Sequence, residues 1–113
     1  MRYCSQRRSI CEYASQNLPL GILPEQEFAA DRLECDSGDV LLLLTDGFSE
    51  VFDVNGAELG LEPIKGAFLK VADRPLPEIF ESLRSLSLRF GKQEDDQTIL
   101  LVRCTGENTT IAV

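Results

Sequence analysis

VLLLLTDG, residues 40–47, places five apolar residues in a row before an abrupt Asp-Gly pair. An uninterrupted apolar run of this kind is typical of a strand that is covered on both faces of its sheet. Asp46 stands at the open end of that strand, where a carboxylate is costly unless a cationic group compensates it. The sequence therefore predicts a strand over residues 40–45, with a charge at its end that needs a partner.

A second apolar strand, QTILLVRC at residues 97–104, follows directly after Glu94-Asp95-Asp96. Asp46 closes one strand and the Asp95-Asp96 pair opens the other, so antiparallel neighbours would bring these carboxylates to one edge of a sheet. Hard divalent cations such as Mg²⁺ and Mn²⁺ prefer carboxylate oxygens. We therefore predict that Asp46 and Asp95 approach closely enough to share or flank a cation.

Two amphipathic helices are predicted between these strands. The first has an apolar face made of Leu61, Ile64, Phe68 and Val71. The second has Pro77 at its start, Gly91 as its C-terminal stop, and a stripe made of Leu76, Ile79, Phe80, Leu83, Leu86 and Phe90. The predicted fold class is α+β, a mainly antiparallel sheet with two covering helices. We expect one shared core of Leu41, Leu43, Ile79, Phe80, Leu83, Ile99 and Leu101.

The remaining segments give weaker signals. Residues 1–17 are compatible with a hairpin that turns near Gln6-Arg7-Arg8, and NLPLGIL at 17–23 is expected to lie across the core. Residues 48–53 are expected to make one helical turn, and DVNG at 53–56 a tight turn. The tail from 105 to 113 carries no pattern that predicts an element.

Composition excludes several classes of function. The chain of 113 residues has a net charge of -8, from 11 basic and 19 acidic residues, which argues against nucleic acid as a ligand. It contains no histidine, so a Ser-His-Asp triad, a Cys-His pair and a His-ligated zinc are excluded within it. The four cysteines form no CxxC pair and are expected to be reduced thiols. Neither a signal peptide nor a run of membrane-spanning length is present, so we expect a cytoplasmic protein without membrane contact by this segment.

Taken singly, the acidic motifs have ordinary explanations. Thr-Asp-Gly after a strand is a common turn, and residues 94–96 alone would read as a solvated loop. DVNGAELGLE, residues 53–62, has its first glycine at the fourth position, whereas a calcium-binding EF-hand loop needs it at the sixth. Ser49 has no basic partner in the sequence pattern that would make it a nucleophile.

The ordered combination is more specific. PLGIL, then SGDVLLLLTDGFSEVFDVNGAELG, then EDDQTILLV resembles the stage II sporulation protein E type of the metal-dependent (PPM, or type 2C-like) protein phosphatases. The resemblance runs over about residues 18–104. It implies an α-β-β-α sandwich, in which two packed antiparallel sheets are flanked by helices and the metals lie at one end.

The resemblance also implies a site. Asp46 and Asp95 would be metal ligands, with Asp96 as the alternative to Asp95, and Gly47 would give clearance at the metal edge. Thr98 would fix the loop by a hydrogen bond, and Gly38, Glu50 and Gly60 are assigned to architecture. Two Mg²⁺ or Mn²⁺ ions would be the cofactors, and no catalytic residue beyond the metal ligands is expected. The substrate would be a phosphorylated regulatory protein, of the kind found in partner-switching pathways that control sigma factors.

One departure from the family pattern sets the expected activity. The family places a further bridging aspartate, in a Gly-Asp motif, in an N-terminal half, so residues 1–113 are expected to form the C-terminal portion of a phosphatase domain. We expect the isolated chain to hydrolyse phosphate monoesters poorly. One alternative is a non-catalytic interaction module that self-associates through an exposed sheet edge. Another is an acidic α+β domain whose aspartates cap turns.

Overall fold

Four strands form an antiparallel sheet in the order β2-β1-β4-β5. The structure is a computed structural model that describes residues 1–106 and 109–112. One of the two inner strands is β4, whose residues all pair with β5, from Val40 opposite Arg103 to Leu44 opposite Ile99. The strand bounds are Arg2–Cys4 for β1, Ser9–Cys11 for β2, Val40–Leu44 for β4 and Ile99–Arg103 for β5. The two strong strands predicted from the sequence are therefore antiparallel neighbours.

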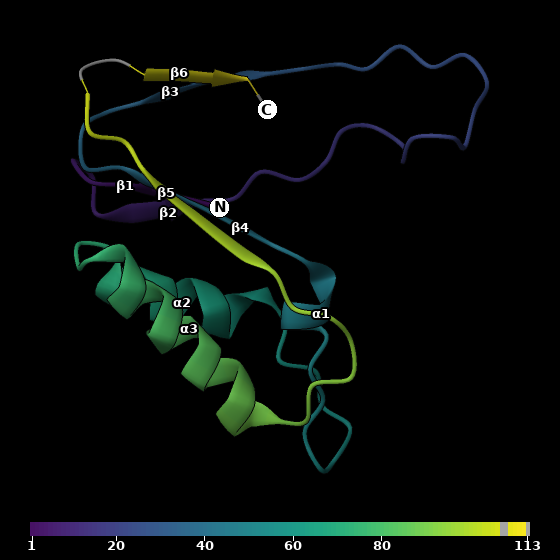
Figure 1. The fold of residues 1–113 in the computed structure, drawn as a ribbon, viewed down its shortest axis with the longest axis vertical. Helices are drawn as coiled ribbons and strands as arrows, with labels where there is room; N and C mark the ends of the chain where they lie inside the picture. The colour runs from purple at the N-terminus through teal and green to yellow at the C-terminus, as the bar shows by residue number, and fades with distance from the viewer. Residues whose placement is uncertain (107–108, 113) are drawn as a thin grey trace.

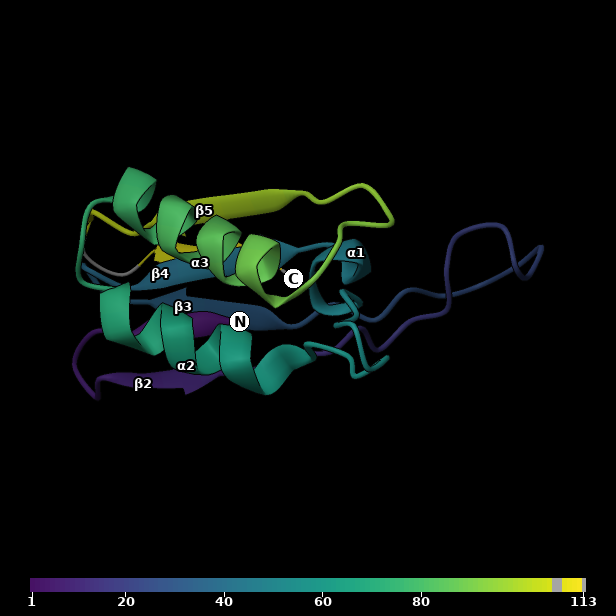
Figure 2. The same cartoon turned by 90° about the horizontal axis from the view of Figure 1, so that it is seen from below.

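Helices α2 (Leu61–Val71) and α3 (Leu76–Phe90) lie side by side on one face of this sheet. Figure 2 shows α3 beside β5 and α2 toward β2. A second sheet, in which β3 (Arg32–Cys35) pairs antiparallel with β6 (Thr109–Ala112), lies beyond the opposite face (Figure 1). The resulting layers are helices, a four-stranded sheet and a two-stranded sheet, which confirms the predicted α+β class. No helix in the described residues is long and apolar enough to cross a membrane.

The main core lies between the helices and the four-stranded sheet, and it corrects one prediction. Ile79 and Leu83 are fully buried there, with Ile99 and Leu101 packed against them, as predicted. The residues of β4 that face the helices are Val40, Leu42 and Leu44. The predicted Leu41 and Leu43 face the other way, because successive side chains of a strand point to opposite faces. Phe80, also predicted to be in the core, lies at its margin and is exposed.

The opposite face of the sheet is only partly covered. Leu41 is buried in a second, smaller cluster with Leu33, Cys35 and Cys104, which joins the two sheets. Leu43 is 52% exposed, so the expectation that both faces of this strand are covered is wrong at its C-terminal end. The helix-facing side of β4 is therefore covered along its length, whereas the opposite side is covered at Leu41 and exposed at Leu43.

Residues 12–31 connect β2 to β3, and the middle of this segment extends away from the sheets (Figures 1 and 2). The predicted packing of residues 17–23 across the core is wrong, because the apolar side chains Leu18, Leu20, Ile22 and Leu23 are all exposed. The hairpin predicted for residues 1–17 is confirmed as β1–β2, with Tyr3 opposite Ile10. The tail, which gave no prediction, contains β6.

Helix α3 begins and ends close to the residues predicted from the sequence. Pro77 lies in the first turn of α3, and Gly91 follows its last residue. Gly91 has extended backbone angles, so a left-handed conformation is not what requires glycine there. A Cβ at this position would instead lie 2.0 Å from the carbonyl oxygen of Phe52. Glycine is required because the chain leaving α3 passes directly against the segment that follows α1 (Asp46–Ser49).

Candidate metal-binding site

The candidate site lies where β4 ends and β5 begins. Because these strands are antiparallel neighbours, Asp46 and the Asp95-Asp96 pair reach the same end of the sheet. The ladder continues one step past the strands, since the Thr45 amide donates to the Thr98 carbonyl oxygen over 3.1 Å. The two motifs, 49 residues apart by 95 − 46, are thus brought together by the pairing of the strands that carry them.

Gly47 is the point of closest packing between the two motifs. A Cβ at Gly47 would lie 2.5 Å from the Asp96 carbonyl oxygen and 3.3 Å from the Cβ of Asp95. Real Cβ atoms do not approach a carbonyl oxygen so closely, so any side chain at position 47 would push the motifs apart. Glycine is needed here for close approach, which is the clearance expected from the sequence.

A threonine hydroxyl ties the two motifs together. Thr45 Oγ1 donates to the Asp96 carbonyl oxygen over 3.3 Å and accepts from the Thr98 amide over 3.0 Å. The sequence assigned this tie to Thr98. Thr98 takes part through its backbone, whereas the hydroxyl in these two bonds belongs to Thr45.

The turn that carries Asp46 is anchored by burial. Asp46 begins α1, a single helical turn two residues earlier than predicted. Phe48 and Val51 are almost completely buried in the main core and anchor the turn to it. The exposed carboxylate of Asp46 accepts from the Gly47 amide over 2.9 Å, and that of Asp95 accepts from the Asp96 amide over 2.7 Å. Each carboxylate is thus oriented by the backbone amide of the next residue while it remains open to solvent.

The candidate ligands are of the chemical type that a hard divalent cation prefers. Asp46, Asp95 and Asp96 offer carboxylate oxygens, which suit Mg²⁺ or Mn²⁺. In the described part of the chain, however, no group of three Asp, Glu, Cys or His side chains is placed to hold an ion together. Residues 1–106 therefore bring two acidic segments side by side, and a metal site built on them would need further ligands from elsewhere.

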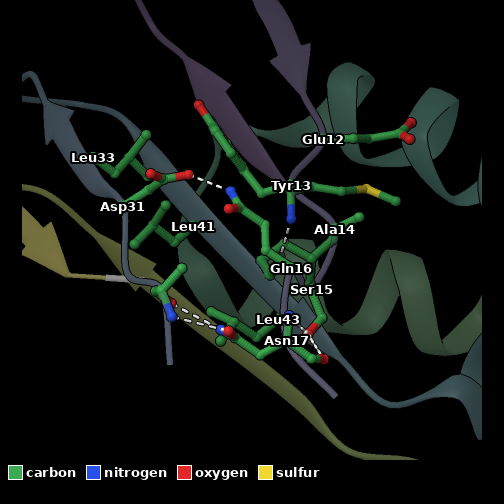
Figure 3. Close-up of a pocket in the computed structure, with 13 residues that line it drawn as sticks. Glu12, Tyr13, Ala14, Ser15, Gln16, Asn17, Asp31, Leu33, Leu41 and Leu43 are labelled. Atoms are coloured by element: carbon green, nitrogen blue, oxygen red, sulfur yellow. Dashed lines mark hydrogen bonds between the residues drawn. The ribbon is translucent and has the colours of Figure 1, made fainter. Parts of the chain in front are cut away.

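Two of the cavities near the sheet differ in their position relative to the candidate site. One of about 190 Å³ lies beside the candidate site and is lined by Phe48, Phe80, Arg84, Leu88, Gln93, Gln97 and Ile99. A larger one of about 600 Å³ lies on the face away from the helices, between Leu41 and Leu43 of β4 and residues 12–17 (Figure 3). Its wall is closed by a hydrogen bond from Gln16 to Asp31. None of the residues that line the larger cavity belongs to the Asp46 or Asp95 motifs.

Gln97 is a residue of this region that the sequence did not single out. Its Nε2 donates to the Gly47 carbonyl oxygen and to Ser87 Oγ of α3, each over 3.0 Å. The one available signal was Ser87 itself, a serine at the position where the apolar stripe of α3 continues from Ile79 and Leu83. A polar residue on a buried helix face indicates a hydrogen-bond partner from another element.

Comparison with known proteins identifies the family. The family described as Stage II sporulation protein E (SpoIIE) matches residues 1–105. The match begins before the start of the resemblance predicted at residue 18 and includes the β1–β2 hairpin. No curated protein and no solved structure matches the chain.

Proposed function

Because the chain belongs to the SpoIIE family, whose members carry a PPM-type phosphatase domain, we propose that it forms the metal-binding portion of a protein serine/threonine phosphatase. The observation that carries the proposal is the meeting of the Asp46 and Asp95 motifs at one end of β4 and β5. Its substrate is a phosphorylated regulatory protein, and its place of action is the cytoplasm. Regulation of sigma factors through such a substrate is the pathway that the family resemblance favours.

In this function, Asp46 and Asp95 would hold the cations through the carboxylate oxygens that the amides of Gly47 and Asp96 leave free. Two Mg²⁺ or Mn²⁺ ions, when bound, supply an activated water for in-line attack on the phosphorus. Gly47 keeps the two acidic segments in contact, and Thr45 fixes the loop that carries Asp96. The chain's own contribution is to hold two ligands rigidly on strand ends, where they reorganise little during the reaction.

Ligand count sets the activity expected from residues 1–113 alone. Two octahedral ions need more ligands than two or three carboxylates supply from one side. We therefore expect the isolated chain to hydrolyse a phosphoserine peptide poorly with Mn²⁺ present. A longer chain that also carries the family's N-terminal half, with its Gly-Asp motif, should be active, and Asp46→Asn in that longer chain should abolish the activity.

The assay tests two claims separately, namely the metal-ligand role of Asp46 and the need for a further bridging carboxylate. If the longer chain turned over the peptide equally well with Asp46→Asn, the metal-ligand role of Asp46 and the proposed function would be refuted. If the 113-residue chain were itself robustly active and lost activity on Asp46→Asn, the function would stand. The requirement for a further bridging carboxylate would then be wrong.

A second candidate function is a non-catalytic interaction module. It is favoured by β5, which is the last strand at one edge of the sheet and carries the exposed side chains Leu100 and Val102. Such an edge is a template for pairing with another chain. Under this alternative the protein binds a partner through its sheet, and Asp46→Asn has no consequence for that binding.

A further inference from the structure

We propose that Gln97 is a positioning residue, which with Ser87 holds the α1 turn against the 95–96 loop and so sets the separation of the Asp46 and Asp95 carboxylates. The inference rests on the proposed function in one respect, namely that these two carboxylates serve one metal site. It concerns a position between the acidic pair and Thr98 that carries no charge. What distinguishes Gln97 is where its two amide hydrogens go.

The carboxamide of Gln97 joins two elements that the strand ladder does not join. One hydrogen bond from Nε2 reaches the Gly47 carbonyl oxygen in α1, and the other reaches Ser87 Oγ in α3. Both are 3.0 Å long, an ordinary length for such bonds. A single half-buried side chain thus connects the turn that carries Asp46, the loop that carries Asp95, and the helix layer.

Ser87 is built into the helix to receive this bond. The buried face of α3 consists of Ile79, Leu83 and Ser87, at successive intervals of four residues. Ser87 is 2% exposed, and a hydroxyl buried among apolar side chains is destabilising unless it is hydrogen-bonded. An alanine or leucine would continue the stripe without that cost. The serine is explained by the bond that it accepts from Gln97.

The geometry around Gly47 makes the position of this turn sensitive. Gly47 packs so tightly under Asp96 that a single added methyl group would collide with the Asp96 carbonyl oxygen. On the strand side, the hydroxyl of Thr45 fixes the loop. On the helix side, Gln97 draws the Gly47 carbonyl toward α3. Loss of the second attachment would leave the Gly47 carbonyl without this bond, so that residues 45–47 could shift relative to the Asp95-Asp96 segment even though Phe48 and Val51 keep the rest of the turn in the core.

A purely structural role for Gln97, satisfying Ser87 and nothing more, predicts different behaviour. Under that reading, loss of the side chain lowers stability but leaves the relation between the two motifs unchanged. The test therefore follows local exchange and metal affinity together, in the 113-residue chain. The variants are Gln97→Met, which keeps the length but removes the donor, Ser87→Ala, and the two combined. Gln26→Met, which removes a half-buried glutamine outside the site whose amide donates to the Leu18 carbonyl, is the matched control.

The first measurement is backbone amide exchange of residues 45–48 and 95–98 by NMR. We expect exchange about fivefold faster in each single variant, the factor that corresponds to one net hydrogen bond, with no further increase in the double variant. The control should exchange at the wild-type rate. Unchanged rates in Gln97→Met, or additive effects in the double variant, would overturn the proposal.

The second measurement is a titration with Mn²⁺, followed by the EPR signal of the free ion, with Asp46→Asn as the reference for the site. We expect weak binding that Asp46→Asn abolishes and that Gln97→Met weakens about fivefold. Equal affinity in Gln97→Met and wild type would reduce Gln97 to a structural role. If Asp46→Asn left the affinity unchanged, the metal-ligand role of Asp46 and the proposed function would fail. A wild type that bound no Mn²⁺ would show that ion binding requires the further ligands of the N-terminal half. The exchange rates would then decide by themselves whether Gln97 holds the two segments together.

Discussion

Asp39 is a buried carboxylate that holds the β1–β2 hairpin against the turn before β4. It is 1% exposed, and it accepts from the amide and the hydroxyl of Ser5 over 2.8 and 2.9 Å and from the Asp36 amide over 3.2 Å. The guanidinium of Arg2 lies 3.9 Å away and balances its charge. A charge removed from water in this way is stabilising only while these partners remain.

Replacement of Asp39 by alanine should therefore lower the free energy of unfolding by about 3 kcal/mol, because three partly buried donors lose their acceptor and the guanidinium of Arg2 loses its counter-charge. Urea denaturation measures the loss. Asp73→Ala is the matched control, since Asp73 is exposed and pairs only loosely with Arg8, and it should change stability by less than about 0.5 kcal/mol. Equal effects of the two substitutions would contradict the structural role of Asp39.

Cys104 gives the fold a dependence on alkaline pH. Burial raises the pKa of its thiol from 9.0 to about 11, and the neighbouring Cys35 thiol adds to the rise. Since the folded-state pKa lies above the unfolded one, the unfolded chain binds fewer protons between these two values. The contribution to stability is then fully present below pH 9 and is lost as the pH rises through 11.

We expect the free energy of unfolding to fall by at most about 1.4 kcal/mol per pH unit between pH 9 and 11 through this thiol. Cys104→Ala removes that dependence, so the difference in stability between wild type and variant should shrink as the pH rises. Urea denaturation at pH 8, 9, 10 and 11 measures it, and Cys11→Ala serves as a comparison. Curves for wild type and Cys104→Ala that stay parallel across this range would contradict the assignment.

At the scale of elements, the register of β4 separates what a sequence can predict from what it cannot. The apolar run predicted the strand, but five apolar residues in succession carry no alternation that would identify the inner face. The prediction chose Leu41 and Leu43, and the helices cover Val40, Leu42 and Leu44 instead. A change of one residue in the choice of face exchanges the whole set of inward side chains.

This register predicts a contrast between two leucines. Leu83→Ala should lower the free energy of unfolding by about 2–5 kcal/mol, because Leu83 is fully buried and its removal leaves a cavity. Leu43→Ala should cost less than about 1 kcal/mol, since that side chain is half exposed. Chemical denaturation of both variants measures the difference. A larger loss for Leu43→Ala would mean that the outer face of β4 is covered in solution.

The other elements likewise divide into those that a local sequence pattern predicts and those that depend on distant parts of the chain. The stripe of α3 was long enough to fix its type, its start near Pro77 and its stop at Gly91. β6 was not predicted because it is short and its partner β3 lies more than 70 residues away in the chain (109 − 35 = 74). The contact between the segments that carry Asp46 and Asp95 could be predicted from the ends of the two strands. The bond from Gln97 to Ser87 depends on how α3 crosses the sheet, and no local pattern of residues contains that information.

At the scale of the whole molecule, the chain is flat. It measures 43 × 42 × 19 Å, and its radius of gyration of 15.5 Å exceeds the roughly 13 Å expected for a compact domain of this length. The excess comes from the extended residues 12–31 and from a sheet that is covered by helices on one face and only partly by β3 and β6 on the other (Figure 1). The exposed apolar residues Leu43, Leu100 and Val102 belong to the partly covered face.

The shape leads to a prediction about self-association. β5 lies at an edge of the sheet, and its residues 99–102 include none of the lysines or prolines that protect natural edges. Pairing of two β5 strands would extend the sheet and bring Leu100 and Val102 of the two copies side by side on its partly covered face. The net charge of -8 opposes the approach of two copies, and salt screens that repulsion without weakening apolar burial. We therefore expect self-association to increase between about 0.05 and 0.5 M NaCl, where the screening length becomes short.

Light scattering coupled to size-exclusion chromatography measures this, and a pair of double variants tests where the contact lies. Leu100→Lys with Val102→Lys places two charges on β5 and should keep the chain monomeric at every salt concentration. Leu69→Lys with Leu88→Lys makes the same change in net charge on exposed positions of α2 and α3 and should associate as the wild type does at high salt. Equal suppression by both pairs would show that charge alone controls association. A wild-type chain that stays monomeric at high salt would contradict self-association through the β5 edge.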